Sequence, residues 1–224
     1  MVLRRTNSPP KPRKILILGD NNVGKTSIII AYKTAKFPAH APHVMETCFV
    51  TTLMQEKHYP LKVFDTGVGG GDFNYDRFRP LAYPRTDVFL VCFKVTSPIS
   101  LDRVRDEWVP EIRHYCSGVP FLLVAAQIDL RDDSEAVTKL TSQTQRLIST
   151  EEGKRLAHEL RAAKYVECST LTQEGLNNIF EEVRGFLRSF TCADRPHEAI
   201  NTTLEFPVNH SPSQSRRRTN CVIV

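Results

Sequence analysis

The sequence predicts an α/β fold, in which a doubly wound, mostly parallel sheet of six strands with one antiparallel edge strand is flanked by helices. Two observations support this prediction. Short apolar segments bounded by loops alternate with segments of helical periodicity, as in repeated βα units. The longest apolar runs, such as Val88–Phe93, span about six residues, whereas a membrane-spanning helix needs roughly 20. Open α/β sheets bind ligands at the carboxyl ends of their strands, so we expect a site at that edge.

Six segments are expected to be strands. Four of them are short and apolar throughout, which is typical of buried parallel strands, and two flank the polar sequence EKHYP and predict an antiparallel hairpin. The parallel strands are expected at Lys14–Leu18, Val88–Val95, Phe121–Gln127 and Lys164–Cys168, and the hairpin strands at Cys48–Gln55 and Leu61–Asp65.

Helices fit the intervals between these strands. We expect them at Lys25–Lys36 and Ile99–Tyr115, because apolar residues recur there at three- and four-residue spacing. Ser149 and Glu152 form a capping box for a helix that runs to Leu160. We expect Thr172 to cap the last helix. Its apolar stripe consists of Leu176, Ile179, Val183, Phe186 and Leu187.

Composition and charge divide the chain of 224 residues into three parts. Residues 1–13 predict a flexible basic extension, residues 14–190 a single globular domain, and residues 191–224 a flexible tail. The hydrophobic content of 41% is that of an ordinary globular protein. The net charge of +5 resides in the two ends, which leaves the middle at about −3. Because a nucleic-acid binder usually carries its positive field on the folded part, this distribution argues against nucleic acid and favours either a membrane surface or a role of the charge in solubility alone.

The six cysteines and the N-terminus bear on the compartment. The cysteines show neither a CxxC pair nor metal-ligand spacing, and several fall in apolar strands. The N-terminal sequence MVLRRTNSPPKPRK lacks the apolar stretch of a secretory signal. We therefore expect a reduced, cytoplasmic protein.

The sequence GDNNVGKT, Gly19–Thr26, matches the phosphate-binding pattern G-x-x-x-x-G-K-[ST] between a predicted strand and a predicted helix. Such a loop surrounds phosphates with backbone N–H groups at a helix N-terminus. Lys25 is expected to neutralise the terminal phosphates. Thr26 is expected to ligate Mg²⁺ through oxygen, which this hard cation prefers. The motif therefore predicts a P-loop NTPase fold.

Two further segments lie at the same edge of the predicted sheet. AAQIDLRDD follows one strand and places Asp129 where a carboxylate could accept two hydrogen bonds from the N–H edge of guanine. ECSTLTQ follows the last strand and places Ser169 and Thr170 nearby. An aspartate at the start of a loop is also a common turn residue, so Asp129 alone does not establish the base.

Several stretches in this order resemble the Rho family of the Ras-superfamily small GTPases: TDVFLVCFKVTSP, WVPEIRHYC, DLRDD and KYVECSTLTQEGL. The resemblance covers about residues 14–190 and includes a segment at about 131–148 similar to the extra helix of Rho proteins. It implies a GTP- or GDP-binding, Mg²⁺-dependent signalling protein. Its partners would be effectors at the switch regions, exchange factors and a prenyl-binding dissociation inhibitor, with roles in the actin cytoskeleton or polarity.

The resemblance also assigns site residues. The phosphate loop would comprise Asn21, Asn22, Val23, Gly24, Lys25, Thr26 and Ser27. Phe37 would lie against guanine, with a plain core aromatic as the alternative, and Asp65 would reach Mg²⁺ through water. Around the base would lie Gln127, Asp129, Ser169, Thr170 and Leu171.

The departures from the family pattern concern hydrolysis. Asn21 and Asn22 stand where the family has glycine and alanine, and an Asn21 side chain would crowd the γ-phosphate. The family's DTAGQE becomes DTGVGGGDF, so the water-orienting glutamine is lost. His43 stands where the family has the threonine that senses Mg²⁺. Thr47 would take the place of that threonine only if the loop changes register. Gln127, after Ala126, replaces the family's lysine. No catalytic residue is assigned.

The chain ends in SRRRTNCVIV, where Cys221 matches a C-a-a-X prenylation signal behind a basic patch. This predicts attachment to the cytoplasmic side of the plasma membrane or endomembranes, with farnesyl and geranylgeranyl both open. Three functions remain open for the chain. The first is a GTP-bound switch with little hydrolysis, and the second is a cycling GTPase in which Asp72 of the rebuilt loop or a partner's side chain positions the attacking water. The third is a scaffold that is insensitive to nucleotide.

Overall fold

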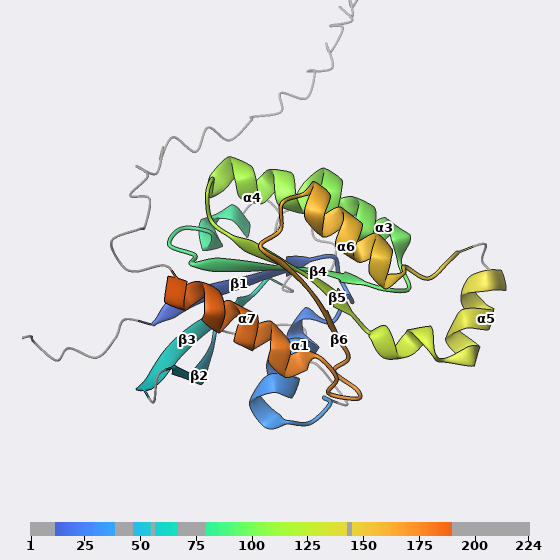
Figure 1. Ribbon diagram of the computed structural model, residues 1–224, viewed down its shortest axis with the longest axis horizontal. Coiled ribbons are helices and arrows are strands. Elements are labelled where there is room, and N and C mark those ends of the chain that lie inside the picture. The colour runs from blue at the N-terminus through green and yellow to red at the C-terminus, as the bar shows by residue number, and fades with distance from the viewer. Residues whose placement is uncertain (1–11, 39–46, 55–56, 67–78, 143–144, 190–224) are drawn as a thin grey trace, which may run out of the picture.

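The computed structural model describes residues 12–38, 47–54, 57–66, 79–142 and 145–189. Its six strands form one sheet in the order β2-β3-β1-β4-β5-β6 (Figure 1). All neighbouring strands in this sheet are parallel except β2 and β3. The mixed six-stranded sheet with one antiparallel edge strand is therefore confirmed. The strands are β1 (Arg13–Gly19), β2 (Cys48–Met54), β3 (Lys57–Asp65), β4 (Val88–Lys94), β5 (Phe121–Ala126) and β6 (Lys164–Cys168).

Helices follow the strands and cover both faces of the sheet (Figure 1). They are α1 (Lys25–Thr34), α3 (Pro98–Arg103), the π-helical turn η2 (Val104–Trp108), α4 (Val109–Tyr115), α5 (Ser134–Ser142), α6 (Thr150–Glu159) and α7 (Leu176–Ser189), with 3₁₀ turns η1 (Arg79–Ala82) and η3 (Ile128–Arg131). Helix α5 lies within the segment 131–148 that was expected to carry an extra helix. Among the described helices, none has the length and apolar character needed to cross a membrane.

Two apolar cores lie on opposite faces of the sheet, because alternate residues of each strand point to opposite sides. On one face Ile15 and Ile17 pack with residues of α1 and α7, including Ile28 and Phe180. On the other face Leu16 packs with residues of the α3–α4 helix and of α6. The Tyr32 and Phe180 rings stack at 3.6 Å, which ties α1 to α7. The buried cysteines Cys48, Cys92 and Cys168 are free thiols.

Strand β1 is the point at which the strand order reverses. It pairs with β3 on one side and with β4 on the other. At such a point the connections leave in opposite directions and open a crevice at the carboxyl end of the sheet, where ligands of this fold class bind. The phosphate-loop sequence begins at Gly19, the last residue of β1. The topology therefore brings the expected site to the reversal point.

Two predicted boundaries differ from the structure. Strand β3 starts at Lys57 and not at Leu61, so most of EKHYP belongs to the sheet. β1 pairs with β3 only from Leu61 onward, so Pro60 borders β2 alone and its missing N–H costs no ladder bond to β1. The prediction that Thr172 caps the last helix is wrong. Helix α7 begins at Leu176, and Gly175 with φ of 65° separates it from the preceding turn.

The other predicted elements are confirmed to within a few residues. The Ile99–Tyr115 helix is continuous, but five of its residues form the π-helical turn η2. Ser149 caps α6, since its side chain accepts a hydrogen bond from the Glu152 N–H at 3.2 Å. Helix α1 ends at Thr34 because Ala35 adopts a left-handed conformation with φ of 53°.

Candidate functional site

The loop after β1 has the backbone conformation that a phosphate-binding turn needs. Gly19 has φ of 136°, and a Cβ there would lie 2.2 Å from the carbonyl oxygen of Cys92, so only glycine fits against β4. Asn22 and Gly24 also have positive φ, 61° and 104°. These conformations end the strand and start helix α1 directly at Lys25. Backbone N–H groups at the start of such a helix have no intrahelical acceptor and are available to an anion.

Lys25 is held at the base of this loop. Its side chain is buried with 4% exposure, and its Nζ donates to the carbonyl oxygens of Gly19 at 2.7 Å and Asp20 at 2.6 Å. Burial lowers the pKa of Lys25, while Cys92, Asp65 and Asp20 oppose this effect. A cation fixed among carbonyl oxygens beside free N–H groups fits the phosphates of a nucleotide.

Two oxygen donors lie side by side next to the loop. The Thr26 hydroxyl, in the first turn of α1, donates to a carboxylate oxygen of Asp65 at the end of β3. Thr66, the residue after Asp65, is fixed to β1 because its hydroxyl donates to the Ile17 carbonyl oxygen at 2.7 Å. The described residues contain no group of three or more His, Cys, Asp or Glu that could hold a metal. This donor set fits Mg²⁺, which is commonly bound by one or two protein oxygens together with water and phosphate.

The loop after β5 contacts the phosphate loop directly. Gln127 has φ of 63°, and its side-chain amide donates to the Asn22 carbonyl oxygen at 3.1 Å. Asp129 lies in the first turn of η3, two residues further on, and is partly buried. A Cβ on Gly24 would approach the Gln127 amide at 3.8 Å. The long neutral side chain of Gln127 thus joins the two loops.

The loop after β6 is fixed by its own hydrogen bonds. Ser169 is fully buried, its N–H donates to the Glu174 carbonyl at 2.9 Å, and its hydroxyl accepts from the Thr172 N–H at 3.1 Å. Thr170 is 8% exposed, whereas Leu171 is 58% exposed. Gly175 is required here, because a Cβ on it would lie 2.0 Å from the Glu167 carbonyl oxygen.

An ion-pair network connects the loop after β5 with the end of β6. The Arg131 guanidinium donates to both carboxylate oxygens of Glu167 at 2.9 and 2.8 Å, to the Thr150 hydroxyl at 3.1 Å and to the Ile148 carbonyl at 3.1 Å. Tyr165 adds a hydroxyl bond of 2.6 Å to Glu167. Burial opposes ionisation of Glu167, but the bonds from Arg131 and Tyr165 lower its pKa. Arg131 and Glu167 each lie two residues from a predicted base-binding residue, Asp129 and Ser169.

The remaining predicted residues are distributed as follows. Asn21 and Asn22 are exposed at the loop, and Val23 is buried beneath it. Phe37 is 49% exposed, so it is not a core aromatic. Thr47 is partly buried, immediately before β2. The predictions on His43, on residues 67–72 and on Cys221 lie outside the described residues.

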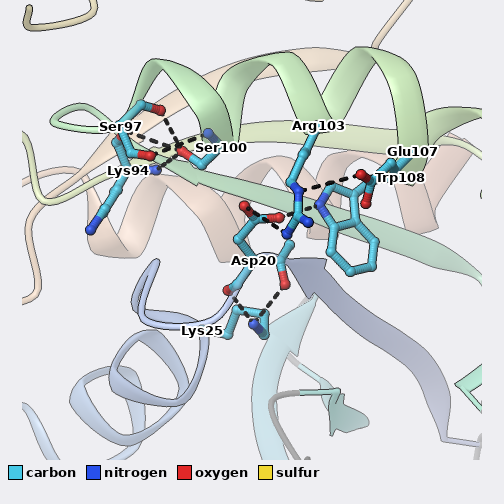
Figure 2. Close-up of polar contacts among 9 residues, drawn as sticks. Asp20, Lys25, Lys94, Ser97, Ser100, Arg103, Glu107 and Trp108 are labelled. Atoms are coloured by element: carbon cyan, nitrogen blue, oxygen red, sulfur yellow. Dashed lines mark hydrogen bonds and ion pairs between the residues drawn. The ribbon is translucent and has the colours of Figure 1, made fainter. Parts of the chain in front are cut away.

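The sequence interpretation missed the surroundings of Asp20 and the Arg131 network. Figure 2 shows the Asp20 carboxylate between Arg103 and Trp108 of the long helix on the other face of the sheet, with its own carbonyl facing Lys25. The available signal was an acidic residue inside a loop expected to bind phosphates. Such a charge needs a cationic or N–H partner, but the partner lies 83 or 88 positions away along the chain.

The family comparison agrees with this geometry. The model of the Ras family matches residues 14–188, which is more than half of the chain and includes all six strands but for the first residue of β1. The sheet order, the loop with Lys25 and the Thr26–Asp65 contact lie within the matched part. The chain therefore belongs to the Ras family of small GTPases, switch proteins that bind guanine nucleotides together with Mg²⁺.

Proposed function

We propose that this chain is an atypical, Rho-like GTP-binding switch that hydrolyses GTP weakly or not at all and rests in the GTP-bound state. In this proposal it binds effectors through its switch regions and acts on the actin cytoskeleton or cell polarity. Its tail tethers it to the cytoplasmic side of a membrane. Exchange factors and a prenyl-binding dissociation inhibitor are further expected partners.

One observation supports this proposal above the others. The groups expected to bind the nucleotide are assembled, while those expected to cleave it are replaced. Lys25 is buried at the base of the loop, and Thr26 contacts Asp65. In contrast, Asn21 is exposed in the position where the family has glycine, and residues 67–78 contain no glutamine.

The residues of this chain would divide the work by location. The backbone of Asn21–Ser27 and Lys25 would hold the phosphates, Thr26 and Asp65 would hold Mg²⁺, and Asp129 would accept hydrogen bonds from guanine. Gln127 would pack beside the base with its amide on the phosphate loop. Ser169–Leu171 would border the base, and Phe37 would lie against it. The bound Mg²⁺ would supply positive charge to the phosphates.

Magnitudes indicate that hydrolysis would be too slow to set the nucleotide state. Intrinsic Ras-type hydrolysis proceeds at about 10⁻⁴ s⁻¹, and an activating protein's arginine adds roughly 10³- to 10⁵-fold. Loss of the water-orienting glutamine affects the first rate. A side chain on Asn21 would obstruct the arginine and so affects the second. The bound nucleotide would then follow exchange and the excess of GTP in the cell.

The proposed tether combines a lipid with charge. Cys221 would carry the prenyl group, and Arg216, Arg217 and Arg218 precede it. One lipid chain alone anchors a protein marginally, so a second signal is needed. Each arginine near anionic lipid contributes about 1 kcal/mol. Together these signals would keep the domain at the membrane.

The direct test is to denature the purified full-length protein and identify the released nucleotide. GTP supports the proposal, GDP supports a cycling GTPase with a rebuilt loop, and an empty site supports a scaffold. Single-turnover hydrolysis then compares the wild type with Asn21→Gly, which we expect to restore sensitivity to a Rho-type activating protein. Lys25→Ala is the control, since it should lose the nucleotide. Ordinary Ras-like hydrolysis with full stimulation in the wild type would contradict the proposal.

A further inference from the structure

The phosphate loop carries a negative side chain, Asp20, that is held by the α3–α4 helix, on the face of the sheet opposite α1. Asp20 directly follows Gly19, and its carboxylate accepts a hydrogen bond of 2.9 Å from the indole N–H of Trp108. Arg103 lies 3.5 Å from the other carboxylate oxygen and 3.3 Å from Glu107 (Figure 2). The Asp20 side chain is 13% exposed, so these contacts replace most of its water.

The same residue also contacts Lys25 through its main chain. The Asp20 carbonyl oxygen accepts from the Lys25 Nζ at 2.6 Å (Figure 2). The position of the Asp20 backbone therefore sets the position of the lysine expected to meet the phosphates. A carboxylate without its partners would be drawn toward Lys25 and would repel phosphate oxygens, because both carry negative charge.

Trp108 is itself fixed by unusual local structure. It is the last residue of the π-helical turn η2, and it is 7% exposed. π-helical turns within helices occur frequently at functional sites. The Arg79 guanidinium lies 4.6 Å from the centre of the Trp108 ring and forms an ion pair of 2.7 Å with Glu111. Arg79 directly follows residues 67–78 in the chain, which include part of the sequence DTGVGGGDF that replaces the family's DTAGQE.

We propose that Trp108 is a positioning residue for the bound nucleotide: acting through the Asp20 carboxylate, it holds the phosphate loop and slows nucleotide release. The contact joins the phosphate loop to helix α3–α4 and, through the Trp108 ring, to Arg79. This inference rests on the guanine-nucleotide binding of the proposed function. It adds a residue outside the nucleotide site that controls how long the ligand stays.

The test is a double-mutant cycle on full-length protein loaded with fluorescently labelled GDP. Trp108→Phe removes the N–H donor and keeps an aromatic ring, and Asp20→Ala removes the acceptor. Loss of a hydrogen bond to a charged group changes the equilibrium constant that depends on it by about a factor of ten. We expect Trp108→Phe to raise the GDP dissociation rate about tenfold in the Asp20 background and less than twofold in the Asp20→Ala background. An equal increase in both backgrounds would overturn the proposal.

A matched control is available on the same helix. Arg105 belongs to the same π-helical turn but pairs with Asp102 and Glu159, away from the phosphate loop. Arg105→Ala should leave the GDP dissociation rate within about twofold of the wild type. If it accelerates release as much as Trp108→Phe does, the effect is a general loosening of the helix and the proposal is wrong.

A second readout separates positioning from structural damage. GMP lacks the β-phosphate, so Trp108→Phe should weaken GDP affinity about tenfold and GMP affinity less than twofold. An equal loss for both ligands contradicts the inference. Trp108 is the single tryptophan of the chain, so wild-type emission reports the surroundings of its indole ring. The emission should change when Mg²⁺ is chelated and GDP is released, and unchanged emission would count against the proposal. A wild type that binds no guanine nucleotide would instead refute the proposed function.

Discussion

Replacing Arg131 with alanine tests whether its network holds the loops after β5 and β6 together. The guanidinium makes four hydrogen bonds to three residues, of which Ile148 and Thr150 lie just before and at the start of α6 and Glu167 lies in β6, and the Arg131 and Glu167 side chains are 21% and 22% exposed. Exposed ion pairs contribute up to about 1 kcal/mol, and breaking buried pairs costs about 3–5 kcal/mol. This intermediate pair should therefore contribute about 2 kcal/mol. For a domain of this size the melting temperature should fall by about 4–8 °C.

The assay is thermal unfolding at saturating GDP, followed by the GDP dissociation rate. Arg146 provides the matched control, because it also binds both oxygens of a carboxylate, that of Glu152, at 2.6 and 2.7 Å. Its side chain is 63% exposed, so Arg146→Ala should lower the melting temperature by only about 1–2 °C. Arg131→Ala alone should accelerate GDP release. If the melting temperatures of Arg131→Ala and Arg146→Ala fall by the same amount, the reasoning is refuted.

Two further predictions concern stability. Burial, and secondly Lys62, lower the pKa of Lys14 from 10.5 to about 8, so the unfolded chain binds more protons between pH 8 and 10.5. Chemical denaturation of wild type and Lys14→Met should show the wild type gaining stability relative to the variant as the pH rises through that window; a constant difference would contradict this. A Cβ on Gly153 would lie 2.3 Å from the Tyr165 hydroxyl, so Gly153→Ala should cost about 1–3 kcal/mol. The same Cβ would lie 2.5 and 2.6 Å from two ring carbons of Tyr165, so combining Gly153→Ala with Tyr165→Ala, which removes the ring, should cost less than the sum of the two single losses; additive losses would show that the clash is not the cause.

The strands and the phosphate loop could be predicted because their signals are local. An apolar run such as Val88–Phe93 and a Gly-x-x-x-x-Gly-Lys-Thr spacing depend only on neighbouring residues. The start of β3 could not be predicted, since Lys57 and His58 are polar, Pro60 is disfavoured within strands, and this part of β3 joins the sheet only through pairing with β2. The start of α7 was misplaced because Thr172 caps a turn, where its hydroxyl accepts from the Glu174 N–H at 3.4 Å.

The site shows the same division. Lys25 and Thr26 were predicted from the loop motif and Asp65 from the family resemblance, and the structure brings the three side chains together. The contacts of Asp20 with Trp108 and of Arg131 with Glu167 were missed, because they join residues 88 and 36 positions apart. Such contacts depend on which helix packs on which face of the sheet. Residue type alone shows that a buried charge needs a partner, but not which partner it finds.

The direction of α7 determines where the rest of the chain is attached. Its 14 residues run back from the carboxyl end of the sheet over a length of about 21 Å. Figure 1 shows its red end at the same side of the molecule as the blue start of β1. The described chain therefore ends at the pole opposite the carboxyl end of the sheet. Under the tether proposed above, the attachment of the tail leaves the crevice free of the chain's own exit, so regulators that dock at the crevice approach from the other pole.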